Sequence, residues 1–235
     1  RQFIYNPGAN FQALALGEVG SAQVTYTATD RHASTSTPGT IAISITGAND
    51  APTATSLSFN VAEGGSLTRS FGGDDIDSDD SLTSLQFTLV TQPPASMGTV
   101  TNNGGGSFTF VPGNAFKSLA FGEQGSTSFT YLARDRHGVA SNVATVAITV
   151  DGVNDKPVVQ NLSVSAVEDG GPVSGTFIGD DIDSDDSPST IAFNIASQPS
   201  EGSASNSTGN AFTFNPGSAF QDLGVNESRS VTYTY

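Results

Sequence analysis

The sequence predicts an all-β protein that repeats a two-sheet sandwich along a linear array. Short segments alternate apolar with polar residues, which is the pattern of a half-buried strand. The 235 residues include 26 glycines and 11 prolines, a composition that favours turns over helices. Four sequence markers also recur in the same order with a period of about 105 residues, which is the size of one sandwich domain.

The expected strands are segments in which every second residue is apolar. They lie at residues 57–61, 87–89, 129–133 and 146–150 of the middle repeat, and at 41–45 and 191–195 of its neighbours. Asn103–Gly106 is rich in glycine and predicts a hairpin turn. The single helical candidate is one turn at Phe116–Leu119, between a Pro-Gly pair and a glycine.

The four markers divide the chain into repeats. The acidic run GDDIDSDDS at Gly73 recurs 106 residues later at Gly179. The others are FxFxPGxxFxxL, a strand that ends in Asp-Arg-His, and a Gly-x-Asn-Asp-x-Pro junction. They predict the C-terminal half of a first repeat at residues 1–48, a complete repeat at 49–153, and a third repeat at 154–235 without its final strand.

The third repeat ends at residues 231–235, which the sequence aligns with 129–132 plus one residue. It therefore lacks a counterpart of 142–150, and the sequence is expected to be a window on a longer array. The alternative is head-to-tail exchange, in which the strand Ile41–Ile45 of one copy completes the third repeat of another copy.

Charge and composition argue against several classes of partner. The chain has 8 Lys+Arg against 23 Asp+Glu, a formal net charge of -15. It offers no basic stripe for nucleic acid or for an anionic lipid surface. Its apolar runs are too short to span a bilayer, and no signal peptide is recognisable in this segment. Cysteine is absent, which excludes disulfides, thiol nucleophiles and cysteine-based zinc sites.

Ten of the seventeen aspartates lie in the two acidic runs. Such crowding costs self-repulsion unless a cation compensates, and calcium takes six to eight oxygen ligands with tolerant geometry. Asp75, Asp77 and Asp79 alternate, so their side chains share one face of an extended segment. The run is not an EF-hand, because Asp80 stands where glycine is expected and Gln86 where glutamate is expected. The alternative is a solvated acidic loop without a metal.

These motifs carry a family resemblance. In their fixed order, xNDxP, VxEGG or VxEDGG, DxDxDD, FxPGxxF and YxAxD resemble the tandem cadherin-like or VCBS-type repeats of giant bacterial RTX-type surface adhesins. The resemblance covers essentially the whole chain and implies Ig-like or cadherin-like Greek-key sandwiches with Ca2+ between successive repeats. The chain departs from animal cadherins by carrying Asp-Arg-His where they carry Asp-Arg-Glu.

The resemblance also implies two sets of metal ligands. At the first junction they would be Asp30, Asn49, Asp50, Glu63, Asp75 and Asp77. At the second junction they would be Asp135, Asn154, Asp155, Glu168, Asp181 and Asp183.

The leading functional hypothesis is a calcium-rigidified extender segment of an extracellular adhesin or surface filament, serving cell adhesion or biofilm attachment. Its partners would be neighbouring repeats of the chain and other copies in a filament. The alternative is a carbohydrate- or protein-binding module, although tryptophan is absent and the aromatic residues fall on core positions. An enzyme is not expected, because two acidic clusters in register fit a repeated structural site better than a glycosidase pair. No Ser-His-Asp order, P-loop or HExxH is visible.

Overall fold

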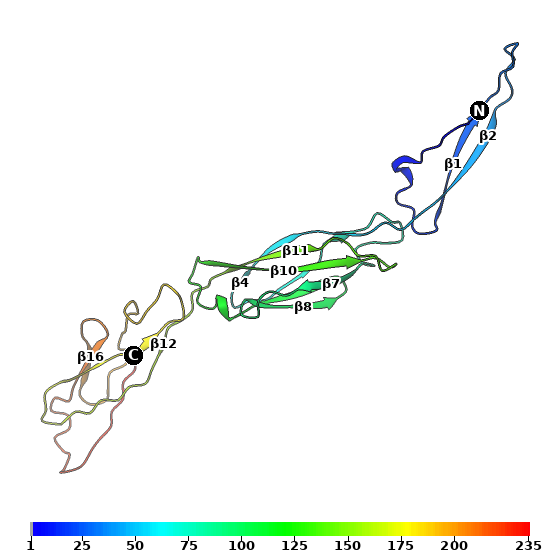
Figure 1. Cartoon of the computed structure of the whole chain (residues 1–235). Helices are drawn as coiled ribbons and strands as arrows, with labels where there is room; N and C mark the ends of the chain where they lie inside the picture. Colours follow the sequence, from blue (N-terminus) through cyan, green and yellow to red (C-terminus); the bar gives the residue numbers. More distant parts are fainter. Residues whose placement is uncertain (1) are drawn as a thin grey trace. The chain divides into compact units, whose positions relative to one another are not determined.

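The computed structural model describes residues 2–235 and divides the chain into two compact units (Figure 1). The first unit contains the chain up to Phe116 together with Gly125–Val150. The second contains Lys117–Gln124 and Asp151–Tyr235. Among the described residues, the only helical segments are two 3-10 turns, η1 (Gly8–Phe11) and η2 (Asn114–Phe116). The all-β prediction is confirmed, with two tandem cadherin-like or Ig-like sandwich domains.

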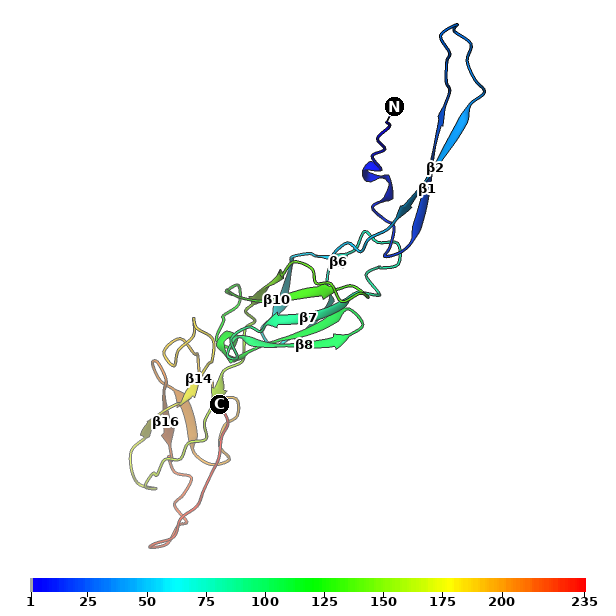
Figure 2. The same cartoon turned by 45° about the vertical axis from the view of Figure 1, so that its right-hand side comes forward.

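The first unit holds a two-stranded sheet followed by a sandwich domain (Figure 2). The strands are β1 (Val19–Tyr26), β2 (Gly39–Thr46), β3 (Thr53–Ala54), β4 (Leu57–Ala62), β5 (Leu67–Ser70), β6 (Gly73–Asp74), β7 (Gln86–Thr91), β8 (Gly98–Gly104), β9 (Ser107–Pro112), β10 (Gln124–Arg134) and β11 (Ala144–Asp151). The sandwich has a four-stranded sheet of order β4-β11-β10-β7 and a three-stranded sheet of order β5-β9-β8. A short β3-β6 pair brings the start of the domain to its acidic run.

Strands β1 and β2 pair along their whole length, from Val19 with Thr46 to Tyr26 with Gly39. The isoleucines of β2 lie at alternate positions on one face, and each is half-buried. The same alternation in β11 buries Val146, Ile148 and Val150 to 0–1% exposure. The period-two pattern therefore predicts both strands correctly, while the degree of burial depends on what packs against the apolar face.

An aromatic cluster fills the sandwich core. Phe71 stacks on Phe87 with ring centroids 5.1 Å apart, and it contacts Phe108 at 5.0 Å and Tyr131 at 4.8 Å. Phe108 also meets Phe129 edge to face at 5.1 Å. Tilted and edge-to-face contacts are the favoured geometries for aromatic pairs. All of these rings are buried, so the marker phenylalanines Phe108 and Phe129 of the middle repeat are core residues.

The Tyr131 hydroxyl ties the core to two backbone segments. It donates to the carbonyl oxygens of Thr55 and Gly72 and accepts a hydrogen bond of 3.1 Å from the Gly72 amide. Burial raises the pKa of Tyr131 above its ordinary value, although these hydrogen bonds oppose the rise. The tyrosine therefore remains a neutral donor that holds the segment between β3 and β4 to the end of β5.

Replacing Tyr131 by phenylalanine is expected to destabilise the first unit by about 1–3 kcal/mol, because two carbonyl groups lose their shared donor. Urea denaturation of the purified chain measures the change. Tyr26→Phe is the matched control, since the side chain of Tyr26 is exposed. Equal stability of the two variants would contradict the role assigned to the buried hydroxyl.

The second unit repeats the design with fewer regular strands. These are β12 (Val158–Val159), β13 (Val173–Thr176), β14 (Gly179–Asp180), β15 (Ser203–Asn206) and β16 (Ala211–Asn215), in sheets of order β12-β14 and β13-β16-β15. Phe177 stacks on Phe193 at 5.4 Å and contacts Phe212 at 4.9 Å, as their counterparts do in the first unit. The same kind of core therefore forms twice.

Tyr235 of the second unit is the structural counterpart of Tyr131. Its ring lies 4.4 Å from Phe177, as the ring of Tyr131 lies 4.8 Å from Phe71, and its hydroxyl donates to a backbone carbonyl. The sequence alignment, which paired Tyr233 with Tyr131, is therefore wrong by two residues. It matched Val-Thr-Tyr to Phe-Thr-Tyr by residue type, whereas packing in the core decides the register.

Two other expectations differ from the structure. The helical turn lies at Asn114–Phe116 rather than Phe116–Leu119, directly after the Pro-Gly pair. Residues 191–195 form no regular strand, although their side chains pack on the core. Their neighbouring segment contributes a single bridge, between Ser197 and Thr234, and a ladder needs successive backbone pairs. The hairpin predicted at Asn103–Gly106 is present between β8 and β9.

Candidate metal centre

The acidic run of the first unit folds into a compact loop after β6. The Asp75 amide donates to the Asp74 carboxylate at 3.0 Å, and the Asp77 amide donates to Asp75 Oδ1 at 3.0 Å. Aspartates favour such side-chain-to-backbone turns because their short carboxylates reach the next amides. The turns direct Asp77 inward, and only 2% of this residue is exposed.

Three segments that are distant in sequence meet at this loop. Asp77 Oδ2 accepts a hydrogen bond of 2.9 Å from the Asp50 amide in the linker before β3. The Asn49 side-chain amide donates to Asp135 Oδ2 at 2.8 Å and to the Asp50 carbonyl at 2.5 Å. Asp135 directly follows β10 and is 3% exposed. The linker, the acidic loop and the end of β10 therefore form one site within the first unit.

Several buried oxygens of this site have no hydrogen-bond donor among the described residues. They are Asn49 Oδ1, Asp75 Oδ2, Asp77 Oδ1, Asp79 Oδ1 and Asp80 Oδ2. A buried polar atom without a partner costs free energy, and a buried carboxylate without one costs more. All five atoms are acceptors, so each needs either a hydrogen-bond donor or a cation to compensate its burial.

The electrostatics indicate that negative charge is in excess. Burial is the main cause that raises the pKa of Asp75, and the charges of Asp77, Asp80 and Asp135 raise it further. Burial acts in the same direction on Asp135, but hydrogen bonds from Asn49, Val139 and His137 outweigh it and lower the pKa. Asp135 is therefore satisfied by protein donors, whereas Asp75 is not.

Arg136 and His137 lie beside the cluster without filling it. Arg136 is 3.6 Å from the carboxylates of Asp79 and Asp80, and His137 Nε2 is 3.3 Å from Asp79. Arg136 is half exposed, which weakens its attraction through solvent screening. Arg136 therefore offsets part of the negative charge of Asp79 and Asp80.

The structure changes the predicted grouping of Asp135 and Asp30. Strand β10 starts beside Asp151, to which Gln124 donates at 2.6 Å, and its 11 residues span about 35 Å. Asp135 therefore lies with Asn49 at the first junction, not at the second. Asp30 correspondingly follows β1 at the far end of the β1-β2 pair, where it is exposed and accepts hydrogen bonds from the amides of His32 and Ser34.

Glu63 also lies away from the first cluster. It follows β4, whose six residues carry the chain about 20 Å from the linker. Of the set that the resemblance implies at the first junction, the structure brings together Asn49, Asp50, Asp75 and Asp77. It adds Asp135, together with Asp79 and Asp80 of the same acidic run. Asp30 and Glu63 lie away from this cluster.

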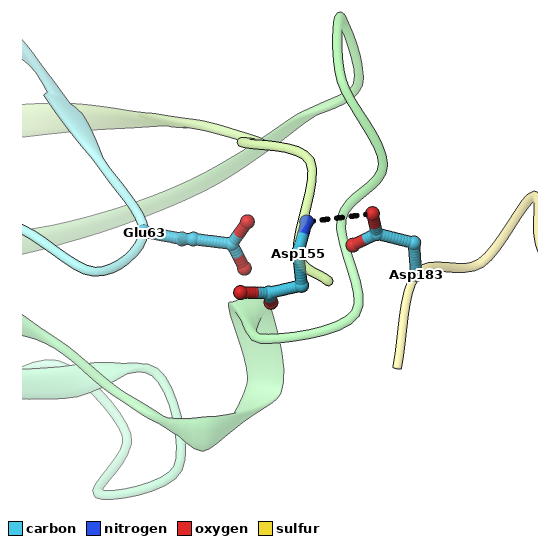
Figure 3. A group of neighbouring side chains, drawn as sticks. All are labelled: Glu63, Asp155 and Asp183. Carbon is cyan, nitrogen blue, oxygen red and sulfur yellow. Dashed lines mark hydrogen bonds between the residues drawn. The ribbon is translucent and has the colours of Figure 1, made fainter. Parts of the chain in front are cut away.

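The second unit repeats the core of this arrangement. The Asp155 amide donates to Asp183 Oδ2 at 2.9 Å (Figure 3), and the Asp183 amide donates to Asp181 Oδ1 at 3.1 Å. The Asn154 side chain donates to the Asp155 carbonyl at 2.5 Å. Asp183 is 3% exposed, and its Oδ1 has no donor in the described part of the chain.

A further observation extends the second cluster. Carboxylate oxygens of Asp183, Asp185 and Asp186 all lie within 4.8 Å of one another, close enough to share a metal ion. Glu168 Oε2 is also buried without a hydrogen-bond partner among residues 2–235, but Glu168 follows the counterpart of β4, as Glu63 does in the first unit, and the structure does not bring it to this cluster. Exposed acids often cluster without a metal, so the buried Asp183 carries more weight than its exposed neighbours.

The sequence analysis missed a serine-glutamate contact that occurs twice. Glu18 Oε2 accepts hydrogen bonds from the Ala15 amide at 3.0 Å and from the hydroxyl of Ser78, in the acidic loop, at 2.5 Å. The Ser78 amide also donates to the Ala13 carbonyl at 2.9 Å. The second unit has the same three hydrogen bonds. Glu123 accepts from the Ala120 amide and from the Ser184 hydroxyl, and the Ser184 amide donates to the Ser118 carbonyl. The recurrence of Glu and Ser at equivalent positions of successive repeats was the sequence signal that could have predicted this contact.

Hydrogen bonds from Ser78 and then from the Ala15 amide hold the pKa of Glu18 below its ordinary value. Ser78→Ala is therefore expected to raise the pKa of Glu18 and leave that of Glu123 unchanged. The pKa of Glu18 is lowered in the folded protein. The contact therefore stabilises the fold fully above the ordinary glutamate pKa, and this stabilisation is lost as the pH falls through the lowered pKa. NMR titration of the side-chain carboxyl carbons measures both groups. Ser184→Ala is the reciprocal control, and an unmoved Glu18 in Ser78→Ala would contradict the contact.

The fold and the clusters define a class of protein: tandem β-sandwich modules with an acidic site where the linker meets the domain. Residues 49–152 match the family described as bacterial cadherin-like domain, and residues 154–235 match bacterial Ig domain. The chain thus carries a bacterial cadherin-like domain followed by a bacterial Ig domain. Such domains are typical of surface and secreted proteins, and they are typically non-catalytic.

A comparison with solved structures matches this chain to a protocadherin, a desmocollin and intimin, among others. Protocadherin gamma B7 domains 1–4 share 17% identity over 86% of this chain and 49% of that one, with a TM-score of 0.39. The human desmocollin-1 ectodomain shares 10% sequence identity over 89% of this chain and 47% of its own, with a TM-score of 0.35. The D00-D0 domain of intimin shares 16% sequence identity over 71% of this chain and 86% of its own, with a TM-score of 0.29.

The chain spans about half the length of the protocadherin and desmocollin structures. A comparison with curated protein sequences gave no match. No helix among residues 2–235 combines the length and the apolar character that a membrane span requires.

Proposed function

We propose that this chain is an extender segment of an extracellular bacterial adhesin or surface filament, in which calcium bound at the acidic clusters stiffens successive repeats. Its role would be to carry an adhesive end away from the cell, for cell adhesion or biofilm attachment. The observation that supports this most is the set of buried, unpartnered oxygens in the first unit, which come from both the linker and the acidic loop.

The donor set fits calcium. Calcium takes six to eight oxygens from carboxylates, amide side chains and carbonyls, whereas magnesium demands a strict octahedron and keeps several waters. The residues that would hold the ion in the first unit are Asn49, Asp75, Asp77, Asp79 and Asp80. In the second unit they would come from Asn154, Asp155, Asp181, Asp183, Asp185 and Asp186. The ion would supply positive charge and would perform no chemical step.

Stiffening follows from where these residues lie. The linker is attached to the acidic loop by the Asp50–Asp77 hydrogen bond and to the end of β10 by the Asn49–Asp135 hydrogen bond. Pro52 is buried and restricts the residue before it to extended conformations. A cation shared by Asn49 and the loop carboxylates would add a third attachment and remove the repulsion that loosens the loop.

Burial weighs against the alternative of a solvated acidic loop. A loop that serves only solubility should expose its carboxylates to water, because burial of an uncompensated charge is costly. Asp77 and Asp183 are 2% and 3% exposed, and they occupy equivalent positions in the two runs. The repeated burial of one member of each run is expected of a metal site.

A calcium titration tests the proposal. Extracellular calcium modules have dissociation constants on the order of 0.1–1 mM. At a hundredfold excess of ion, binding to the folded state alone stabilises it by about 2.7 kcal/mol. We expect chelator to lower the melting temperature and to broaden the small-angle scattering distance distribution, as residues 47–53 and 152–158 gain freedom. Unchanged melting and scattering in chelator would disprove the calcium role, and magnesium at equal ionic strength is the control.

A further inference from the structure

A tight turn in the segment before β1 contacts the acidic loop of the first unit. The Glu18 amide donates to the Ala15 carbonyl at 2.9 Å, and the Ala15 amide donates back to Glu18 Oε2 at 3.0 Å. Gly17 lies between them with a φ of 79°, the left-handed conformation that a type II turn requires. The turn is therefore fixed by its own backbone and by the Glu18 carboxylate.

The same turn occurs twice in the second unit. At Ala120–Glu123 the two hydrogen bonds measure 2.9 and 3.0 Å, and Gly122 has a φ of 89°. At Gly224–Glu227 they measure 2.9 and 2.8 Å, and Asn226 takes the left-handed position with a φ of 68°. Asparagine is one of the few residues besides glycine that tolerate this conformation. The recurrence indicates that the turn is a constant element of the repeat.

The turn holds the linker that leads to the first cluster. The Gly47 amide donates to the Glu18 carbonyl at 2.7 Å, and the Gly17 amide donates to the Gly47 carbonyl at 3.1 Å. A Cβ atom at Gly47 would lie 2.3 Å from the Ala15 carbonyl oxygen, so only glycine allows this approach. Gly47 is two positions before Asn49, whose Oδ1 is one of the buried oxygens of the cluster. The turn is therefore attached to one side of the cluster through the linker.

Ser78 attaches the turn to the other side of the cluster. Its amide donates to the Ala13 carbonyl at 2.9 Å, and its hydroxyl donates to Glu18 Oε2 at 2.5 Å. The carbonyl of the same peptide unit belongs to Asp77 and accepts from the Asp80 amide at 3.1 Å. Because a peptide unit is planar, these contacts fix its orientation from both sides. They therefore help to place the Asp77 side chain, which is buried and whose Oδ1 has no donor among residues 2–235.

The second unit contains the equivalent connection. The Ser184 hydroxyl donates to Glu123 Oε2 at 2.5 Å, and the Asp183 carbonyl accepts from the Asp186 amide at 3.2 Å. The Gly152 amide donates to the Glu123 carbonyl at 2.9 Å, and a Cβ atom at Gly152 would again lie 2.3 Å from a carbonyl oxygen of the turn. Each buried aspartate is therefore followed by a serine that the turn holds.

We propose that docking of the turn on Ser78 is coupled to calcium binding at Asp77, so that the docked turn raises the calcium affinity of the first cluster. Such coupling is reciprocal in free energy, so bound calcium in return holds the turn in place. Ser184 and the Ala120–Glu123 turn do the same for the second cluster. Ser78 and Glu18 are positioning residues, because they act on the ion only through Asp77. This inference rests on the calcium function proposed above.

A calcium titration of the full chain followed by NMR tests the coupling, because the amides of Asp77 and Asp183 report the two clusters separately. Ser78→Ala should raise the calcium dissociation constant of the first cluster about 5-fold and leave the second unchanged. This is the lower end of the usual range for coupled sites, since Ser78 and Glu18 are exposed and water competes for their contact. Ser184→Ala is the reciprocal control and should weaken the second cluster alone.

Conservative variants separate positioning from charge and from folding. Ser78→Thr keeps a hydroxyl and should retain the affinity that Ser78→Ala loses. Glu18→Gln keeps an acceptor for Ser78 and should bind calcium more tightly than Glu18→Ala, although both variants lose the same charge. The effects of Ser78→Ala and Glu18→Ala should not add in the double variant, because each removes the same contact. A role in folding alone would lower the melting temperature equally in calcium and in chelator, whereas coupling lowers it more in calcium.

The possible failures of this inference and of the calcium function are distinguishable. Equal calcium affinity in the natural chain, Ser78→Ala and Glu18→Ala overturns the coupling and leaves the calcium function standing. A natural chain that binds no calcium overturns both. Additive losses in the double variant also overturn the coupling, because the two residues would then act separately.

Discussion

Replacing Asp77 by asparagine is expected to reduce calcium affinity at the first cluster by a factor on the order of 100 or more. The change removes one charge and the buried Oδ1 acceptor, while the amide oxygen can still accept from the Asp50 amide. Loss of outer partners of a metal ligand alone typically reduces affinity by about 10- to 100-fold, so loss of a residue that the proposed function places on the ion itself should have at least the larger effect. Isothermal titration calorimetry measures the affinity and the number of sites.

Asp74→Asn is the matched control, because it removes the same charge from the same run at an exposed position. Asp183→Asn should affect the second cluster and leave the first nearly intact, since distant sites behave independently. In chelator the Asp77 variant should be more stable than the natural chain, because one buried repulsive charge is gone. Greater stability in saturating calcium as well would favour the solvated-loop alternative.

Replacing Phe71 by alanine is expected to destabilise the first unit by about 3–5 kcal/mol, the usual cost of a large aromatic truncation in a core. Phe71 is 2% exposed, and its ring contacts Phe87, Phe108 and Tyr131. This loss is a large part of the roughly 5–15 kcal/mol by which domains are usually stable, so the unfolded fraction of the first unit should rise steeply. Hydrogen exchange read separately at β9 and β16 should show loss of protection in the first unit only.

The control for this variant is Phe121→Ala, because Phe121 is 82% exposed. Surface substitutions away from special features usually change stability by less than about 0.5 kcal/mol. Phe177→Ala is the equivalent change in the second unit and should remove protection at β16 rather than β9. If Phe71→Ala left β9 protected, the aromatic cluster would not be what holds the sandwich together.

Most of the fold could be predicted from local patterns. The alternation at Val146, Ile148 and Val150 identified β11 and its buried face, and the glycines of Asn103–Gly106 identified a hairpin. Alternation alone does not make a strand, as residues 191–195 show, because a ladder also needs a neighbour in register. The two-residue error at Tyr235 has the same origin: residue type was matched where packing decides.

The sequence predicted that an acidic site exists, but it predicted less accurately which residues form it. Asp75 and Asp77 are close in sequence, so the run itself pointed to them. The meeting of Asn49 with Asp135 depends on the direction of β10, which returns the chain to the start of the domain. The contact of Ser78 with Glu18 was missed because an uncharged hydroxyl gives no signal in a charge pattern.

Hydrogen bonds join the start of the sandwich domain to residues near its end, and this affects how fast the domain can fold. Asn49 and Asp135 are 86 positions apart, and Ala54 and Asn142 are 88 apart, yet each pair is joined by hydrogen bonds. Contacts of such separation require the entropy of a long loop to be lost before they form, which places folding in the range of milliseconds to seconds. A nascent or translocating chain therefore cannot complete this domain until residues beyond Asn142 have emerged. Until then it would remain an open, collapsed intermediate that a chaperone or protease could recognise.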